Sequence, residues 1–256
     1  MLLQAYDDQL RGVPRSAPAG VTYEVDGPIT RVVGQFRGFI AAPRDVGLRG
    51  TSLDTLIARQ RDFFAARGEA VEWKTRGHDE PADLPDRLRA AGFEPEELET
   101  VLIGVALEMA ASPLLPEHVI LRSVTAREDL DRIAHMQSTV WGGDSWDWLA
   151  DDLAGRLEAD PAELEILVAE AADEVVSAAW IVYRPDTDFA GLWGGSTLPE
   201  WRGKGIYRSL VAERANRAVA RGVRYLQVDA SADSAPILQR LGFKAVTTTT
   251  PYVWRP

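Results

Sequence analysis

The chain contains no cysteine, and histidine is nearly as scarce. Without cysteine there is no disulfide bond, no thiolate zinc site and no cysteinyl acyl-enzyme. The three histidines, His78, His118 and His135, do not have the spacing of metal ligands. We therefore expect a protein that binds no metal and does not rely on thiol chemistry of its own.

Long apolar runs are missing as well. None approaches the roughly 18 residues that a membrane-spanning helix needs. The segment from Met1 to Asp8 has no basic residue and no long apolar core, so we expect no signal peptide. These absences lead us to expect a cytoplasmic protein that works without a membrane.

Positive charge is scarce, with 28 Lys and Arg against 39 Asp and Glu and a net charge of −11 at pH 7. This balance argues against nucleic-acid binding, which requires a basic surface. The distribution is uneven, because residues 126–174 hold 14 acids and three arginines, whereas residues 198–256 hold ten bases and four acids. Two interpretations explain this distribution equally well. In one, two solvated helix faces differ by chance. In the other, the acidic half meets a cation and the basic half meets phosphates.

Two common phosphate-binding motifs are also absent, the Gly-x-x-x-x-Gly-Lys-Ser/Thr loop and a Gly-x-Gly-x-x-Gly after a strand pattern. In their place stands Arg202-Gly203-Lys204-Gly205-Ile206-Tyr207. It lies between an apolar strand pattern at 189–197 and a helix pattern at 208–221. Such a turn leaves several backbone N–H groups unpaired, and the helix dipole adds positive potential. The loop therefore predicts an anion site, with a plain glycine turn as the alternative.

The surrounding pattern alternates strands and helices. Helices are expected at 127–140, 146–158 and 234–243, and strands at 117–123, 164–171, 174–183 and 225–229. This order and the loop resemble the second half of the GNAT (Gcn5-related) N-acetyltransferases, whose pyrophosphate loop reads Arg/Gln-x-x-Gly-x-Gly/Ala. Arg202 and Gly205 match, while Tyr207 replaces a small residue and is expected to restrict the approach of the pyrophosphate.

The resemblance covers about residues 117–256. It implies a mixed α+β fold with a central, mostly antiparallel sheet flanked by helices. It also implies direct transfer of an acyl group from acetyl-CoA, the cosubstrate, to an amine in a ternary complex, without a metal. The expected CoA-binding residues are Thr197, Leu198, Arg202, Gly203, Lys204, Gly205, Ile206, Tyr207, Arg208 and Ser231. The family's bulged strand end corresponds to Ser196–Leu198, so we expect the Leu198 amide to polarise the thioester carbonyl.

The N-terminal part of the sequence shows the same order of predicted helices and strands. A helix pattern at 53–66 ends before Gly68, a strand follows at 71–74, and a short helix ends at Gly92-Phe93, as a later one ends at Gly242-Phe243. Residues 48–52 stand where the phosphate loop belongs, but the second glycine is missing. We therefore expect two GNAT-like modules in tandem: a partial, degenerate one at 1–113 without a CoA loop, and a catalytic one at 117–256. A chance likeness between αβ units is the alternative.

The family's customary catalytic side chains are not where the resemblance would place them. The strand at 189–197 has no acid, and Leu238 occupies the position of the usual thiolate-protonating tyrosine. As substitutes we name Asp229, Ser234 and Tyr252. Each has a simpler interpretation: a polar strand end for Asp229, a helix N-cap for Ser234 and a half-buried strand residue for Tyr252.

The turn at 141–148 is rich in tryptophan and lies where the family forms its acceptor site. Trp141, Asp144 and Trp146 combine aromatic faces with a carboxylate, which suits a cationic or aromatic amine. A tryptophan cluster that covers the sheet is an equal alternative.

The function we expect is acetyl transfer from acetyl-CoA to a primary amine of a small acceptor, by a monomer or homodimer. Two other hypotheses remain open. A CoA-binding pseudoenzyme or acyl-CoA sensor would explain the missing Glu and Tyr. A purely structural interaction protein would leave the intact loop at 202–205 without a use.

Overall fold

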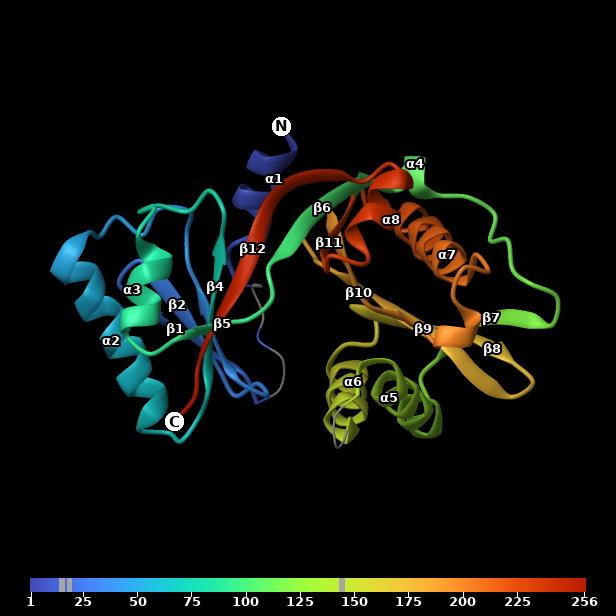
Figure 1. Ribbon diagram of the computed structural model, residues 1–256, viewed down its shortest axis with the longest axis horizontal. Coiled ribbons are helices and arrows are strands. Elements are labelled where there is room, and N and C mark those ends of the chain that lie inside the picture. The colour runs from blue at the N-terminus through green and yellow to red at the C-terminus, as the bar shows by residue number, and fades with distance from the viewer. Residues whose placement is uncertain (14–16, 18–19, 143–145) are drawn as a thin grey trace. The chain divides into compact units, whose positions relative to one another are not determined.

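The computed structural model describes residues 1–13, 17, 20–142 and 146–256. They form two compact units. Unit 1 comprises Met1–Ile103 and Asp229–Pro256, and unit 2 comprises Gly104–Val228. Each unit has a sheet flanked by helices (Figure 1). The predicted mixed α/β class is therefore confirmed.

Unit 1 contains a six-strand path in the order β1-β2-β3-β4-β12-β6, with β5 paired to β12. The pairs are antiparallel except β3 and β4, which are parallel. The strands are β1 (Thr22–Asp26), β2 (Ile29–Val33), β3 (Gly38–Ala41), β4 (Val71–Arg76), β5 (Glu94–Pro95), β6 (Glu99–Val105) and β12 (Lys244–Trp254). The helices are α1 (Leu2–Leu10), α2 (Gly50–Ala65), α3 (Leu84–Ala90) and α8 (Ala235–Arg240).

The core of unit 1 forms where α2 covers the sheet. Leu53, Leu56, Ile57 and Phe64 recur at helical spacing and are buried against strand residues such as Trp73. The elements predicted for the first copy of the repeat, a helix, a strand and a short helix, are present as α2, β4 and α3.

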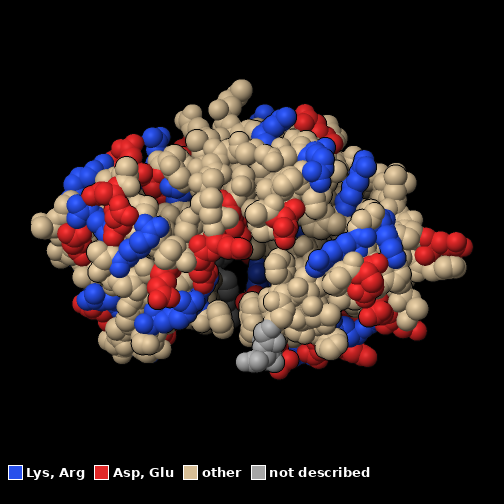
Figure 2. All heavy atoms as spheres, viewed as in Figure 1, with Lys and Arg blue, Asp and Glu red and all other residues tan. Residues whose placement is uncertain are grey.

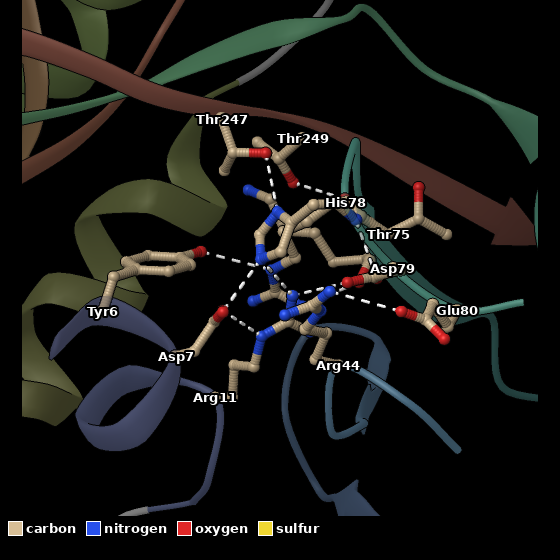
Figure 3. A network of polar contacts seen from close by, with 12 residues as sticks. Tyr6, Asp7, Arg11, Arg44, Thr75, His78, Asp79, Glu80, Thr247 and Thr249 are labelled. Carbon is tan, nitrogen blue, oxygen red and sulfur yellow. Dashed lines mark hydrogen bonds and ion pairs between the residues drawn. The ribbon is translucent and has the colours of Figure 1, made fainter. Parts of the chain in front are cut away.

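A polar network fastens α1, a helix that the sequence analysis did not predict, to the rest of unit 1 (Figure 3). Asp7 accepts from Arg11 over 2.5 Å and lies 2.9 Å from His78 Nε2. Arg11 also donates to Asp79 over 2.5 Å, and His78 Nδ1 lies 2.8 Å from the Thr247 hydroxyl. His78 therefore has a structural partner on each ring nitrogen. The part of the chain that the structure describes holds no group of three or more His, Cys, Asp and Glu arranged for a metal.

Unit 2 has the strand order β7-β8-β9-β10-β11. Its pairs are antiparallel except β10 and β11, which are parallel. The strands are β7 (Val119–Val124), β8 (Leu164–Ala171), β9 (Glu174–Tyr183), β10 (Phe189–Thr197) and β11 (Tyr225–Ala230), the last of which runs on into unit 1 at Asp229. The helices are α4 (Ala106–Met109), α5 (Arg127–Trp141), α6 (Asp147–Ala159) and α7 (Ile206–Ala220), with a 3-10 turn at Pro199–Trp201.

Helices α5 and α6 cover one face of the unit 2 sheet and α7 the other (Figure 1). The two faces are apolar because β8 and β9 are buried almost throughout, as expected for strands sandwiched between helices. No helix among the described residues is long and apolar enough to cross a membrane.

The compact units do not follow the predicted modules. Residues 229–256, expected to complete the module at 117–256, belong to unit 1 because β12 pairs with β4 from Thr249↔Arg76 to Trp254↔Val71. A long-range strand pairing of this kind leaves no local signal in the sequence. The division into a degenerate module at 1–113 and a catalytic module at 117–256 stays a prediction.

Candidate active site

The predicted phosphate loop connects β10 and the 3-10 turn to the first turn of α7. Gly205 is the N-cap residue of α7 with φ +83°, and Gly203 has φ +74°. L side chains rarely adopt this conformation, so both glycines are required by the backbone. The turn aims the start of a 15-residue helix at the loop.

Six consecutive N–H groups at this point, those of residues 203–208, have no acceptor among the described residues. The first hydrogen bond of the helix runs from the Ser209 N–H to the Gly205 carbonyl over 3.0 Å. Unpaired N–H groups in a glycine turn, together with the positive end of a helix, form an anion site. The loop therefore has donors available to an anion, and its role as an anion site stays a prediction.

The side chains of the loop have different roles. Arg202 Nε donates to the Thr197 carbonyl over 3.1 Å and so ties the loop to the end of β10. Lys204 Nζ lies 4.5 Å from the centre of the Trp201 ring. Arg208 is exposed and has no ion pair within the described ranges. Lys204 and Arg208 are thus the side-chain charges available to an anion, while Arg202 shapes the loop.

The bulge in β10 lies earlier than the resemblance predicted. The register with β9 shifts between Trp193 and Ser196, which places the bulge at Gly194 and Gly195. The Leu198 N–H, which we expected to polarise a thioester, donates to the Val176 carbonyl over 3.0 Å. That prediction is wrong because ladder pairing with β9 has resumed at this point and uses the donor.

Contacts with large aromatic rings fix the bulge. A Cβ at Gly194, which has φ +62°, would lie 1.9 Å from the Trp180 ring, and one at Gly195 would lie 2.8 Å from the Tyr207 ring. From α5, the Gln137 side-chain amide donates to the Gly194 carbonyl over 2.9 Å. The bulge is thus held from both faces of the sheet.

Arg214 of α7 lies beneath the bulge and is only 1% exposed. Its Nε donates to the Leu210 carbonyl over 3.1 Å, and its Nη1 donates to the carbonyls of Trp180 and Trp193 over 3.2 and 3.4 Å. No carboxylate of the described chain lies within ion-pair distance of it. Burial lowers the pKa of Arg214 to about 10, so it remains a cation at neutral pH.

Thr197 lies at the end of β10 and is buried. Its hydroxyl is 2.8 Å from the Ser177 hydroxyl, which also contacts the Ser196 carbonyl at 2.6 Å. The Thr197 side chain is therefore engaged within the sheet.

The residues expected to bind the acceptor differ in their exposure and in their contacts. Trp141 is 57% exposed, and its indole N–H donates to the Ser196 hydroxyl over 2.9 Å, which places its ring beside the bulged strand. Trp146 donates to the Gly142 carbonyl over 2.8 Å, packs partly on the core of unit 2 and lies 5.6 Å from the Trp148 ring. Asp144 lies outside the described residues. Trp141 is thus an accessible aromatic face, while Trp146 partly fits the alternative of a covering cluster.

The expected catalytic side chains and Ser231 all lie in unit 1, whereas the loop lies in unit 2. Asp229 forms an ion pair with Lys74 over 2.7 Å. The Ser234 hydroxyl lies 3.2 Å from that of Ser231 and makes no cap bond to α8. Tyr252 is 3% exposed in the core of unit 1, more buried than expected because β4 and β5 flank it on both sides. The roles of these residues stay predictions.

Charge is separated within unit 2, as the sequence indicated. On the face drawn in Figure 2, basic side chains gather over α7, and acidic ones lie along the lower edge of the region of α5 and α6. Part of the basic group is neutralised, since Arg217 and Arg221 pair with Glu165 over 2.7 and 2.5 Å. The loop cations Lys204 and Arg208 are outside this pairing.

Residues 128–243 match the model of the acetyltransferase (GNAT) family. The chain carries a GNAT acetyltransferase domain. The match begins in α5, includes the bulged strand and the loop, and ends just after α8, so it continues from unit 2 into unit 1. The family uses acetyl-CoA as its acyl donor.

Solved structures share the fold. A GCN5-related N-acetyltransferase from Kribbella flavida is 17% identical with a TM-score of 0.71, covering 93% of this chain and 90% of that chain. One from Sphaerobacter thermophilus is 17% identical with a TM-score of 0.63, covering 91% and 82%. A tandem GNAT protein from the clavulanic acid biosynthesis pathway is 12% identical with a TM-score of 0.64, covering 99% and 94%. No curated protein matches the sequence. The GNAT fold is confirmed, and the full-length match to a tandem protein fits the two-module arrangement.

Sequence reasoning missed several residues that build this site. The adjacent glycines at 194 and 195 inside a strand pattern were a usable signal, because glycine within a strand often marks a bulge. No sequence signal pointed to Gln137 and Arg214, because polar residues on helices are normally exposed.

Proposed function

We propose that the chain is an N-acetyltransferase that moves an acetyl group from acetyl-CoA to a primary amine of a small acceptor. The transfer is direct, within a ternary complex. The observation that carries the proposal is the set of unpaired N–H groups of residues 203–208 at the start of α7. A pyrophosphate presents several acceptor oxygens to such a set, and the two glycines leave its approach open.

The side-chain charges support the same ligand. Lys204 and Arg208 are exposed at the loop, and neither has an acidic partner within the described part of the chain. Exposed cations that are not consumed by ion pairs remain free to neutralise phosphates. The loop is therefore the half of the proposed site for which the geometry gives the stronger support.

The acceptor side rests on the exposed aromatic face of Trp141 and on the acidic surface of α5 and α6. Aromatic rings attract cations through their negative faces, and carboxylates add long-range attraction. We therefore propose a cationic or aromatic amine as the acceptor. Thr197 is left to contact the pantetheine arm through its backbone.

Thermal melting tests the binding step. A ligand that binds only the folded state raises its stability, by about 2.7 kcal/mol at 100 times its Kd. Acetyl-CoA should raise the melting midpoint, whereas S-acetylpantetheine, which lacks the pyrophosphate, should raise it far less. No shift with saturating acetyl-CoA would overturn the proposal.

Charge-reversal variants locate the site. The double variant K204E/R208E alters exposed side chains only and should weaken acetyl-CoA binding at least about tenfold, or about 1.4 kcal/mol. R240E, at an exposed arginine of α8 that has no ion pair among the described residues, is the matched control and should bind like the wild type. Equal affinity of both variants would place the ligand elsewhere.

A panel of amines separates an enzyme from a sensor. Release of free CoA thiol is followed with aliphatic diamines, arylalkylamines and amino acids as acceptors. Amine-dependent thiol release supports transfer. Acetyl-CoA binding without release for any amine would favour the CoA-binding sensor.

A further inference from the structure

One tyrosine of unit 2 links the loop to the bulge. Tyr207 contributes its N–H to the unpaired set of residues 203–208, and its ring touches the Gly195 position of β10. A ligand held by its pyrophosphate at the loop and by its acyl end at the bulge therefore passes this side chain. The residue replaces a small one of the family pattern, so the contact belongs to this chain.

The Tyr207 hydroxyl is free to react. It has no hydrogen-bond partner in the described part of the chain. It is also not fully buried, since the buried side-chain atoms without a partner are Arg11 Nη1 and Trp73 Nε1 within the same residues. Burial raises the pKa of Tyr207 and the nearby Arg214 charge opposes that rise, so the phenol keeps its proton at neutral pH.

The Arg214 charge needs an explanation beyond hydrogen bonding. Its contacts to the carbonyls of Leu210, Trp180 and Trp193 satisfy three acceptors, but a neutral donor would satisfy acceptors too. Burial of an unpaired cation costs several kcal/mol. Arg214 binds the Trp193 carbonyl at the start of the bulge, and the Tyr207 ring lies against Gly195 two residues further along the same bulge, so the charge and the phenol are neighbours.

We propose that Tyr207 is the catalytic acid that protonates the departing CoA thiolate, and that Arg214 is a positioning residue that stabilises the resulting phenolate. This assignment rests on the proposed function. It replaces our earlier candidates Ser234 and Tyr252 as the acid. It also accounts for Leu238, which cannot donate a proton and is buried in unit 1.

The amine nitrogen forms a bond to the thioester carbonyl carbon, and the C–S bond breaks with its electron pair on sulfur. The Tyr207 Oη proton moves to that sulfur, which gives the CoA thiol and a phenolate. The amine nitrogen releases its surplus proton to solvent, and solvent returns one to the phenolate.

Arg214 is required because this proton transfer is uphill for an ordinary tyrosine. A cysteine thiol has a pKa of about 8.5 and a tyrosine phenol one of about 10, and burial raises the pKa of Tyr207 further, so such a thiolate is a weaker base than the Tyr207 phenolate. A fixed cation that water cannot screen lowers the energy of the phenolate and reduces this gap. A buried arginine without a carboxylate partner provides such a cation.

The substitution Tyr207→Phe tests the acid directly. It removes one oxygen and keeps the ring against Gly195. We expect kcat to fall at least about 100-fold, the usual range for loss of a general acid, with the melting shift caused by acetyl-CoA unchanged. Tyr225→Phe, at the start of β11 with its ring packed on Phe189, is the matched control and should keep its kcat. A kcat for Y207F within threefold of the wild type would overturn the assignment.

Arg214 is tested by separating charge from packing. R214M removes the cation and should lower kcat about tenfold or more. The melting midpoint should fall only modestly, since the relief from burying an unpaired charge offsets part of the loss of hydrogen bonds to the three carbonyls. R214K keeps the charge and should recover part of the lost kcat. Equal loss in both variants, or a loss that follows the melting midpoint, would show a structural role only.

The wild type run in parallel distinguishes this inference from the proposed function. If the wild type transfers acetyl groups while Y207F does so equally well, the acid assignment fails and the proposed function stands. If the wild type binds acetyl-CoA but transfers to no amine in the panel, both fail together.

Discussion

The Gln137 side chain on α5 donates to the Gly194 carbonyl on β10, on the far side of the sheet from Arg214. The two contacts hold one bulge from opposite faces. Trp180 of β9 and Tyr207 of α7 fill the space that Cβ atoms at positions 194 and 195 would need. A bulge supported by three neighbouring elements is a built feature that redirects the strand next to the site.

Gly194→Ala should disrupt this bulge. The new Cβ would meet the Trp180 ring at 1.9 Å, and φ +62° is unfavourable for alanine. Strain and overpacking together should cost about 2–4 kcal/mol of unfolding free energy. Chemical denaturation measures this cost.

Gly155→Ala is the matched control. Gly155 lies in the interior of α6, and nothing lies within 4 Å of its Cβ position. The change should stabilise the protein by about 0.5–1 kcal/mol, since alanine favours the helix. An alanine at position 194 that is tolerated as well as one at position 155 would contradict the strain argument.

Acid should weaken the network around α1. Burial alone would raise the pKa of Asp7, but hydrogen bonds from Arg11 and His78 outweigh this and lower it below 3.8. Because the pKa of Asp7 is lower in the folded state, its contribution to the free energy of unfolding is complete above pH 3.8. This contribution is lost as the pH falls through the pKa of the folded state. The wild type should therefore lose more unfolding free energy between pH 5 and pH 3 than Asp7→Asn does.

The adjacent Asp8→Asn is the control for this measurement, because Asp8 is exposed and has no ion pair among the described residues. It should follow the wild type at every pH. At pH 7, D7N should lower the free energy of unfolding by about 1–3 kcal/mol, since it weakens hydrogen bonds between charged groups. Parallel pH curves for D7N and the wild type would refute the role of Asp7.

The regular elements of unit 2 were predictable from sequence, since apolar periodicity and glycine caps are local signals. The strands at 164–171, 174–183 and 189–197 match the observed bounds. The bulge position was not predictable in the same way, because contacts of Gly194 and Gly195 with distant rings determine it. The helix α1 was missed because it is held by ion pairs with residues near position 78, and the pairing of β12 with β4 joins residues about 175 positions apart.

Lys74 is the counter-ion of an acidic cluster in unit 1. It lies 2.7 Å from Asp229 and 3.4 Å from Glu99. Burial, with the nearby Asp229 charge, raises the pKa of Glu99 despite the lysine. Lys74→Met would remove the counter-ion that Asp229 and Glu99 share and should lower the free energy of unfolding by about 3–5 kcal/mol.

The double variant K74M/D229N should recover part of that loss, because neighbouring charges are coupled and non-additive. D229N alone also tests our earlier candidate for a catalytic role. An ion-pair role predicts lower stability with kcat retained for the folded fraction. A fall in kcat without a loss of stability would instead support catalysis by Asp229.

Trp141 should determine acceptor affinity. Its ring is exposed, and its indole N–H is tethered to Ser196 beside the bulge. Trp141→Ala removes the aromatic face and should raise the KM for a cationic amine by about 5- to 30-fold, which corresponds to a cation–π contribution of about 1–2 kcal/mol. Binding of acetyl-CoA and kcat at saturating amine should change little, since the loop and Tyr207 are untouched. Trp148→Ala, at an exposed ring of α6 that packs against Trp146, is the comparison variant. Equal KM increases in both variants would mean that surface aromaticity in general, and not the tethered ring, attracts the amine.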